Sequence, residues 1–112
     1  MTLDDFQRAA ARTLNPALDE RAQLLDATAG LAEEGGEALS HVRKHWFQNR
    51  PLDRERLTSE LGDALWCIAA AASALGVTLE EVARRNLEKL WERYPTGVRQ
   101  QGNRGAREPG VE

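Results

Sequence analysis

Apolar residues recur at helical spacing along most of the chain, most clearly in residues 57–75, LTSELGDALWCIAAAASAL. Leu57, Leu61 and Leu65 in this segment are four residues apart, as on one face of a helix. From Ala64 onward the segment has almost no polar side, and a helix that is apolar all round is typical of a buried position. We therefore predict that this helix is buried on all sides and lies at the centre of the fold.

Similar patterns predict three further helices. The four predicted helices cover about residues 2–14, 19–47, 53–75 and 78–94. Capping boxes are predicted at residues 2–5 and 78–81. We expect Asp53 to be the N-cap of the third helix and Gly76 to be the glycine that ends it. Because no segment alternates as a strand does and the connections are short, we expect an all-α, four-helix bundle.

Length and charge limit the function classes. A chain of 112 residues is enough for one domain, which we expect over residues 1–96, while residues 97–112 lack periodicity and read as a disordered tail. A net charge of −3 argues against binding to nucleic acid through a basic face. The first residues do not read as a secretory signal, so we expect none, and the longest apolar run is too short to cross a membrane. We therefore expect a cytoplasmic protein that binds neither nucleic acid nor a membrane. Cys67, the only cysteine, is expected in the core.

Two acidic pairs carry the candidate chemistry. Glu34 and Glu37 share a flank of the second helix, and Glu60 and Asp63 share a face at the entrance of the third. A short turn between these helices makes them antiparallel neighbours, so the pairs could face each other. Four converging carboxylates would repel strongly unless a cation lay between them, and oxygen ligands suit Mg²⁺ or Mn²⁺. The alternative is that both pairs are solvated and only keep the protein soluble.

Two nearby features refine this interpretation. A di-iron centre needs Glu-x-x-His motifs on two helices. Here the residues three positions after Glu34 and Glu60 are Glu37 and Asp63 rather than histidines, so the di-iron pattern fails. Gly35-Gly36 in mid-helix costs roughly 1 kcal/mol per glycine relative to alanine. That cost indicates either close approach of another helix or a ligand, or a flexible kink in a solvated strip.

The acidic motif Glu33-Glu34-x-x-Glu37, followed after 22 residues by Glu60-x-x-Asp63, resembles the MazG-like nucleoside triphosphate pyrophosphohydrolases of the all-α NTP pyrophosphatase superfamily. The stretches GLAEEGGE, ELGDALW, LGVTLEEVA and NLEKLWERYP extend the resemblance over residues 24–97. It implies Mg²⁺-dependent hydrolysis of (d)NTPs between the α- and β-phosphates, with Mn²⁺ as a possible substitute. It also implies a homodimer or homotetramer with the active site near a subunit interface.

The resemblance further implies roles for individual residues. The metal ligands would be Glu34, Glu37, Glu60 and Asp63; Glu33 and Glu37 would help to activate water; and the substrate-binding residues would be Asn86, Lys89, Arg93 and Tyr94. From the residues alone, Asn86 could instead make a helix-to-helix hydrogen bond, and Lys89 and Arg93 could be surface side chains. Gly35 and Val98 depart from many relatives, and base specificity stays open.

A non-catalytic helical dimer, acting as a nucleotide-binding or protein-interaction module, is the alternative function. The three tryptophans Trp46, Trp66 and Trp91 would then be interface anchors. Under the enzyme interpretation, Trp46, Trp66 or His41 could instead touch the base.

Overall fold

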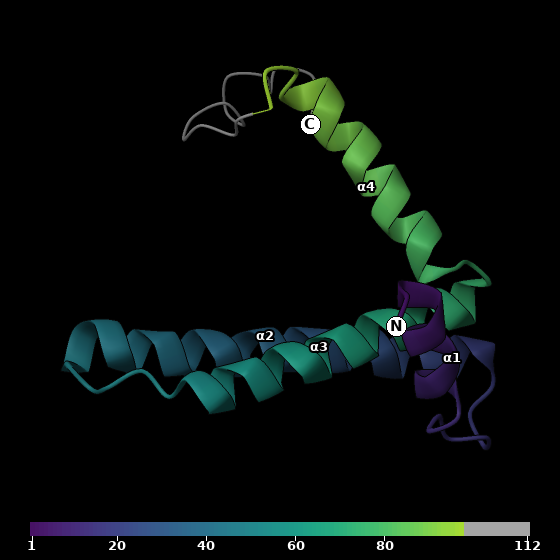
Figure 1. Cartoon of the computed structure of the whole chain (residues 1–112). Helices are drawn as coiled ribbons and strands as arrows, with labels where there is room; N and C mark the ends of the chain where they lie inside the picture. Colours follow the sequence, from purple (N-terminus) through teal and green to yellow (C-terminus); the bar gives the residue numbers. More distant parts are fainter. Residues whose placement is uncertain (98–112) are drawn as a thin grey trace. The chain divides into compact units, whose positions relative to one another are not determined.

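The computed structural model describes residues 1–97 and contains four helices in this range and no strand. They are α1 (Leu3–Ala11), α2 (Glu20–Gln48), α3 (Arg54–Leu75) and α4 (Leu79–Arg93), shown in Figure 1. The predicted all-α class is therefore confirmed. The chain divides into two compact units, which meet between residues 79 and 80 in the sequence and are treated separately below. The predicted tail lies almost entirely outside the described residues, so the domain boundary at residue 96 stays a prediction.

Local capping explains where the helices begin and end. Thr2 and Asp5 form the predicted capping box in both directions, and the side chain of Asp53 accepts the N–H of Arg56 at 3.0 Å as the N-cap of α3. Gly76 ends α3 with a φ of 77°, a left-handed conformation that glycine adopts without strain. The first helix ends at Ala11 rather than near Leu14, because hydrogen bonds between residues three apart tighten the chain there.

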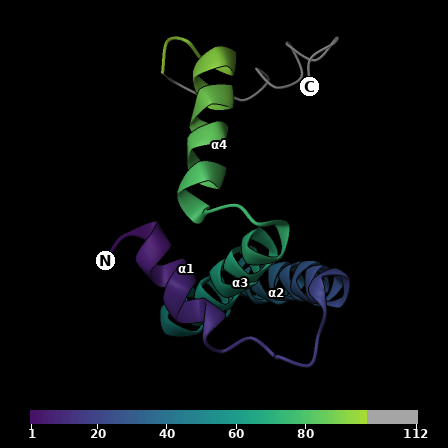
Figure 2. The ribbon, with the colours of Figure 1, turned by 90° about the vertical axis from the view of Figure 1, so that its right-hand side faces the viewer.

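The first unit is built on an antiparallel pair of helices. Figure 1 shows α2 and α3 side by side and joined at one end by residues 49–53, which we call the closed end. Figure 2 shows α1 packed across α3 at the other end of the pair. The small core between these helices consists of Ala10, Ala69, Ala72 and Leu79, with Phe6, Trp66, Ile68 and Val77 packed against it. Small alanine side chains in this core let the helix backbones approach closely.

Gln7 on α1 fixes the end of α3 and the first residue of α4. Its buried side-chain amide donates to Ser73 Oγ at 3.2 Å and to the carbonyl of Val77 at 3.0 Å. Its oxygen accepts the N–H of Leu79 at 2.8 Å, which satisfies one of the amide groups that a helix start leaves without an intrahelical partner. This buried side chain therefore holds the α3–α4 turn against α1.

Within the first unit, the prediction that the third helix is buried on all sides is wrong. The buried apolar positions of α3 are Cys67 and four alanines, whereas Leu61 and Leu75 are 59% and 63% exposed. On α2, Leu39 and Trp46 of the predicted apolar side are also exposed. The reason is that, within this unit, only α1 and α2 pack against α3, so they leave an apolar face of α3 uncovered.

No single helix within residues 1–97 combines the length and the apolar character that a membrane crossing needs. The helices α3 and α4 meet these criteria only when they are counted together as one broken segment.

The close helix approach predicted at Gly35-Gly36 occurs instead at Gly30. A Cβ atom added at Gly30 would lie 2.9 Å from Cys67 Sγ, which is closer than a carbon and a sulfur can pack. A Cβ added at Gly35 or Gly36 meets no atom within 4 Å, and α2 continues through both positions. The glycine that the α2–α3 contact requires is therefore Gly30.

Replacing Gly30 by valine is expected to lower the free energy of unfolding by about 2 kcal/mol, because the new side chain must displace a buried neighbour. The matched control Gly36→Val adds the same side chain in open space and should leave stability unchanged or slightly raised. Urea unfolding followed by circular dichroism measures both. Removing the sulfur with Cys67→Ala should reduce the loss, and equal stability of the two valine variants would refute the contact.

Candidate functional site

The antiparallel α2–α3 pair brings the two predicted acidic pairs to neighbouring helices. Glu60 is buried, with 7% of its surface exposed, and Glu34 is half-buried. Glu37 and Asp63, each three residues further along its helix, are exposed, as is Glu33. Each helix therefore contributes one shielded carboxylate and at least one exposed one.

The electrostatics of Glu34 show that these carboxylates lie near one another. Removal from water raises the pKa of Glu34, and the negative charges of neighbouring carboxylates raise it further. In order of effect, these neighbours are Glu37, Asp63, Glu33 and Glu60. Since two of them come from α3, the fold gathers the other four predicted acidic residues around the carboxyl group of Glu34.

Two of the carboxylate oxygens lack a hydrogen-bond partner within residues 1–97. Oε1 of Glu34 and Oε1 of Glu60 are both buried and unpaired, while Oε2 of Glu60 accepts a hydrogen bond from Arg56 Nε at 3.4 Å. A buried carboxylate oxygen without a donor is costly, and the cost disappears when a cation binds. Carboxylate oxygens are also the ligands that Mg²⁺ and Mn²⁺ prefer. The donor set therefore fits a hard divalent ion.

The side chains do not converge on a single point as they stand. Within residues 1–97, no three acidic, histidine or cysteine side chains lie close enough together to hold a metal ion. A complete ligand set would need Glu37 and Asp63 to rotate, which their exposed side chains are free to do. The four metal ligands accordingly stay a prediction, supported by the position of Glu34 and Glu60.

A second feature of the site was missed in the sequence. Between Glu37 and the closed end lies a pocket of about 450 Å³, which we call the hairpin-end pocket. Its lining residues are Glu37, Ser40, His41, Lys44, His45, Arg50, Pro51 and Arg56. The sequence did contain a signal for this pocket. Arg56 lies four residues before Glu60, and His41 lies four residues after Glu37, so each basic group is one helical turn from a predicted metal ligand.

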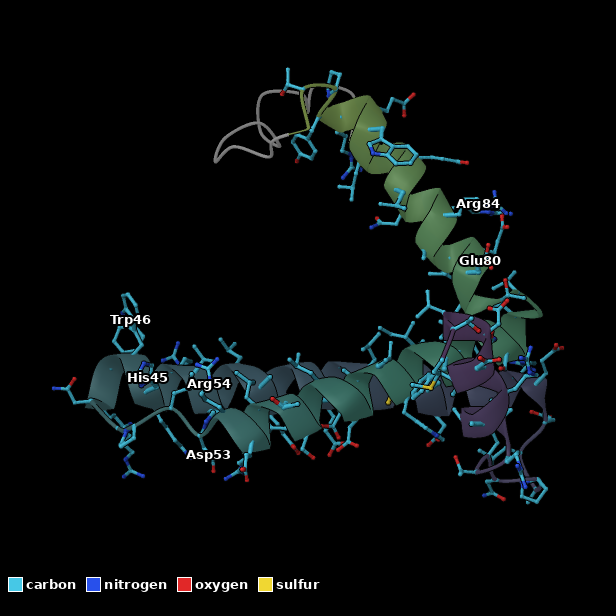
Figure 3. All side chains as sticks on the ribbon, in the orientation of Figure 1. His45, Trp46, Asp53, Arg54, Glu80 and Arg84 are labelled. Carbon is cyan, nitrogen blue, oxygen red and sulfur yellow. The ribbon has the colours of Figure 1, made fainter. Side chains whose placement is uncertain are left out.

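The aromatic candidates for base contact lie in different environments. The side chain of Trp46 is 74% exposed and projects away from α2 near the closed end (Figure 3). The indole N–H of Trp66 donates to Thr13 Oγ1 at 2.8 Å and its ring packs against the small core, so Trp66 is not an exposed anchor. His41 Nε2 accepts the backbone N–H of Asp53 at 3.0 Å, which ties α2 to the start of α3.

The predicted substrate-binding residues all lie on or directly after α4, in the second unit. Asn86 is exposed, and the alternative of a helix-to-helix hydrogen bond stays a prediction. Lys89 is also exposed, and Arg93 is half-buried. Tyr94 is 6% exposed and borders an apolar pocket of about 220 Å³ with Leu90 and Trp91 among its lining residues. Substrate contact by these four residues stays a prediction.

Comparison with known proteins supports the sequence-based assignment. The model of the MazG nucleotide pyrophosphohydrolase domain matches residues 23–98. The Gene 37 protein of Mycobacterium phage L5 is 36% identical over 106 residues, which cover 88% of this chain and 93% of that protein. The uncharacterized protein YvdC of Bacillus subtilis strain 168 is 36% identical over 73 residues, which cover 57% of this chain and 69% of that protein. No solved structure matches the chain significantly.

The family match spans both acidic pairs and all of α4. The resemblance drawn from the sequence is confirmed, and the chain belongs to the family of MazG nucleotide pyrophosphohydrolase domains.

Proposed function

We propose that this protein hydrolyses nucleoside triphosphates between the α- and β-phosphates in a Mg²⁺-dependent reaction, with nucleotide-pool housekeeping as its role. The observation that carries this proposal is the pair of buried, unpaired oxygens of Glu34 and Glu60 on neighbouring helices. Buried carboxylate oxygens without a donor are costly to fold, and the cluster becomes favourable when a divalent ion and a polyphosphate complete it. Membership in the MazG family supplies the reaction class.

In the proposed mechanism Glu34, Glu37, Glu60 and Asp63 would hold the divalent ion. When bound, Mg²⁺ would lower the pKa of water and offset charge on the phosphate oxygens. Glu33 and Glu37 orient the attacking water, and one of these exposed carboxylates accepts its proton as the oxygen attacks the α-phosphorus. The bond from the α-phosphorus to the bridging oxygen breaks, and pyrophosphate leaves with the bonding pair.

Residues of α4 are proposed to bind the substrate, as the family motif implies. Lys89 and Arg93 are one helical turn apart and would donate to the departing pyrophosphate as its negative charge develops. Asn86 and Tyr94 would contact the nucleotide. These assignments rest on the matching positions of the family motif rather than on a contact within the chain.

The open apolar face supports assembly of the protein as a homodimer or homotetramer. The large apolar side chains exposed on α2 and α3 are Leu25, Leu39, Val42, Trp46, Phe47, Leu61, Leu65 and Leu75. An exposed apolar surface of this kind is typical of a protein interface, because association removes it from water. Self-association would also cover α3, the helix that the sequence predicts to be buried.

The direct test is a screen of purified protein against the common and damaged (d)NTPs, with separate assays for pyrophosphate and orthophosphate. We expect pyrophosphate and the nucleoside monophosphate in equal amounts, dependence on Mg²⁺, and partial replacement by Mn²⁺. Release of orthophosphate with a diphosphate would refute cleavage between the α- and β-phosphates. Absence of turnover with every substrate would favour the non-catalytic module.

A further inference from the structure

The hairpin-end pocket concentrates positive charge in an acidic protein. Three cationic side chains, Lys44, Arg50 and Arg56, face a single lining carboxylate, that of Glu37. The chain as a whole carries a net charge of −3, so this arrangement runs against its overall balance. A concave surface lined by one sign of charge raises the local concentration of ions of the opposite sign.

Most of this positive charge is not neutralised by the residues that the structure describes. Lys44 and Arg50 form no ion pair with any residue in the range 1–97. Arg56 contacts Glu60 only through a long 3.4 Å interaction of Nε, which leaves the other guanidinium nitrogens without a carboxylate partner in that range. The pocket therefore offers donors from three side chains to a bound anion.

The closed end is shaped so that these groups are held beside α2. The ring nitrogen Nδ1 of His45 lies 2.7 Å from the carbonyl oxygen of Arg50 and must donate to it, because a carbonyl only accepts. His41 accepts the N–H of Asp53, and the Asp53 carboxylate is engaged at the start of α3. Figure 3 shows His45 and Asp53 at this end of the helix pair. The two bonds anchor the connecting segment at Arg50 itself and at Asp53.

The pocket is continuous with the acidic site. Glu37 lines it and also acts on the carboxyl group of Glu34, while Arg56 lines it and contacts Glu60. An extended polyanion whose first phosphate lies at the acidic residues therefore has the cationic pocket within reach. Apart from two imidazoles that are already hydrogen-bonded, no aromatic ring lines the pocket, so its walls suit phosphate oxygens better than a stacked base.

We propose that the hairpin-end pocket binds the pyrophosphoryl end of the triphosphate substrate, through Lys44, Arg50 and Arg56. This inference rests on the proposed function for the identity of the substrate. Because cleavage between the α- and β-phosphates divides the substrate into two products, pyrophosphate and the nucleoside monophosphate each report on one half of the site.

The first experiment measures binding of inorganic pyrophosphate by calorimetry in the presence of EDTA, so that it depends on neither the metal nor turnover. The double variant Lys44→Gln/Arg50→Gln should bind pyrophosphate about tenfold more weakly than the wild type, as the loss of charge-assisted hydrogen bonds predicts. The matched control is Arg43→Gln, which removes a neighbouring arginine on α2 that lies over the ring of Phe47 and does not line the pocket. Equal binding by the double variant and the control would overturn the proposal.

The second experiment uses product inhibition of (d)NTP hydrolysis. The double variant should raise the inhibition constant of pyrophosphate about tenfold and leave that of the nucleoside monophosphate unchanged. If the monophosphate constant changes instead, the pocket belongs to the nucleoside half of the substrate and the proposal is wrong. If the wild type hydrolyses no (d)NTP, the proposed function is wrong. The pocket is then not a substrate site, even if calorimetry shows that it binds pyrophosphate.

Discussion

Replacing Glu37 by glutamine or Asp63 by asparagine is expected to lower kcat/KM for (d)NTP hydrolysis by at least about 10²-fold, the scale seen when one electrostatic contact to the reacting centre is lost. Each change keeps the shape of the side chain but removes its negative charge. Both residues are exposed and neither makes a hydrogen bond that holds the helices, so the fold should be unaffected. Steady-state pyrophosphate release measures activity, and far-UV circular dichroism checks the helical content.

The matched control for this experiment is Asp26→Asn. Asp26 is an exposed acid on the same helix as Glu37, more than two turns away from it, and it is not among the charges that act on Glu34. This variant should keep activity close to that of the wild type. Turnover like that of the wild type in either Glu37→Gln or Asp63→Asn would rule out the proposed site.

Magnesium is expected to stabilise the protein against unfolding, by about 2.7 kcal/mol when its concentration is one hundred times the dissociation constant. The reason is that the folded state alone gathers the carboxylates of α2 and α3 around Glu34. The variant Glu34→Gln should lose most of this response, because it removes the charge at the centre of the cluster. Thermal melting in EDTA and at increasing Mg²⁺ concentrations measures both effects.

Without metal, Glu34→Gln is expected to raise the melting temperature of the protein, by an amount that depends on pH. The pKa of Glu34 is raised in the folded state above the ordinary value of 4.5, mainly by removal from water and then by neighbouring carboxylates. The stability contributed by this group is therefore fully present below the ordinary value and is lost as the pH rises through the raised pKa. Because its surroundings disfavour the ionised form of Glu34, Glu34→Gln should melt at a higher temperature than the wild type in EDTA at pH 7.

This advantage of Glu34→Gln should disappear near pH 4, where the wild-type side chain is itself neutral. Glu33→Gln is the comparison, since Glu33 is next to Glu34 in the chain but is exposed. The Glu33→Gln variant should therefore change the metal-free melting temperature less than Glu34→Gln does. A metal-free wild type that is more stable at pH 7 than Glu34→Gln, together with no response to Mg²⁺, would contradict a cation site at these residues.

The helices and the spacing of the acids could be predicted from the sequence because both depend on near neighbours in the chain. Periodicity placed α2 and α3 to within a few residues, and the caps at Thr2, Asp53 and Gly76 depend on hydrogen bonds that span only a few positions. The pairing of Glu34 with Glu37 on one flank likewise follows from helix geometry alone. The family resemblance rests on the same local motifs, and the family match confirms it.

The sequence did not predict which residues the assembled helices shield. The exposure of a side chain depends on how its helix is rotated about its axis when it packs. This rotation shields Glu34 and Glu60 but leaves Glu37, Asp63 and Leu61 exposed. The contact between Gly30 and Cys67 joins positions far apart in the chain.

The sequence by itself determined an all-α chain, its helix ends and an acidic motif with the spacing of the MazG family. Only the tertiary structure decided that Glu34 and Glu60 carry the unpaired oxygens and that a cationic pocket adjoins them. The physical reason is that helix formation is governed by interactions within a few residues, whereas burial, unsatisfied hydrogen bonds and pockets arise only when distant segments pack together.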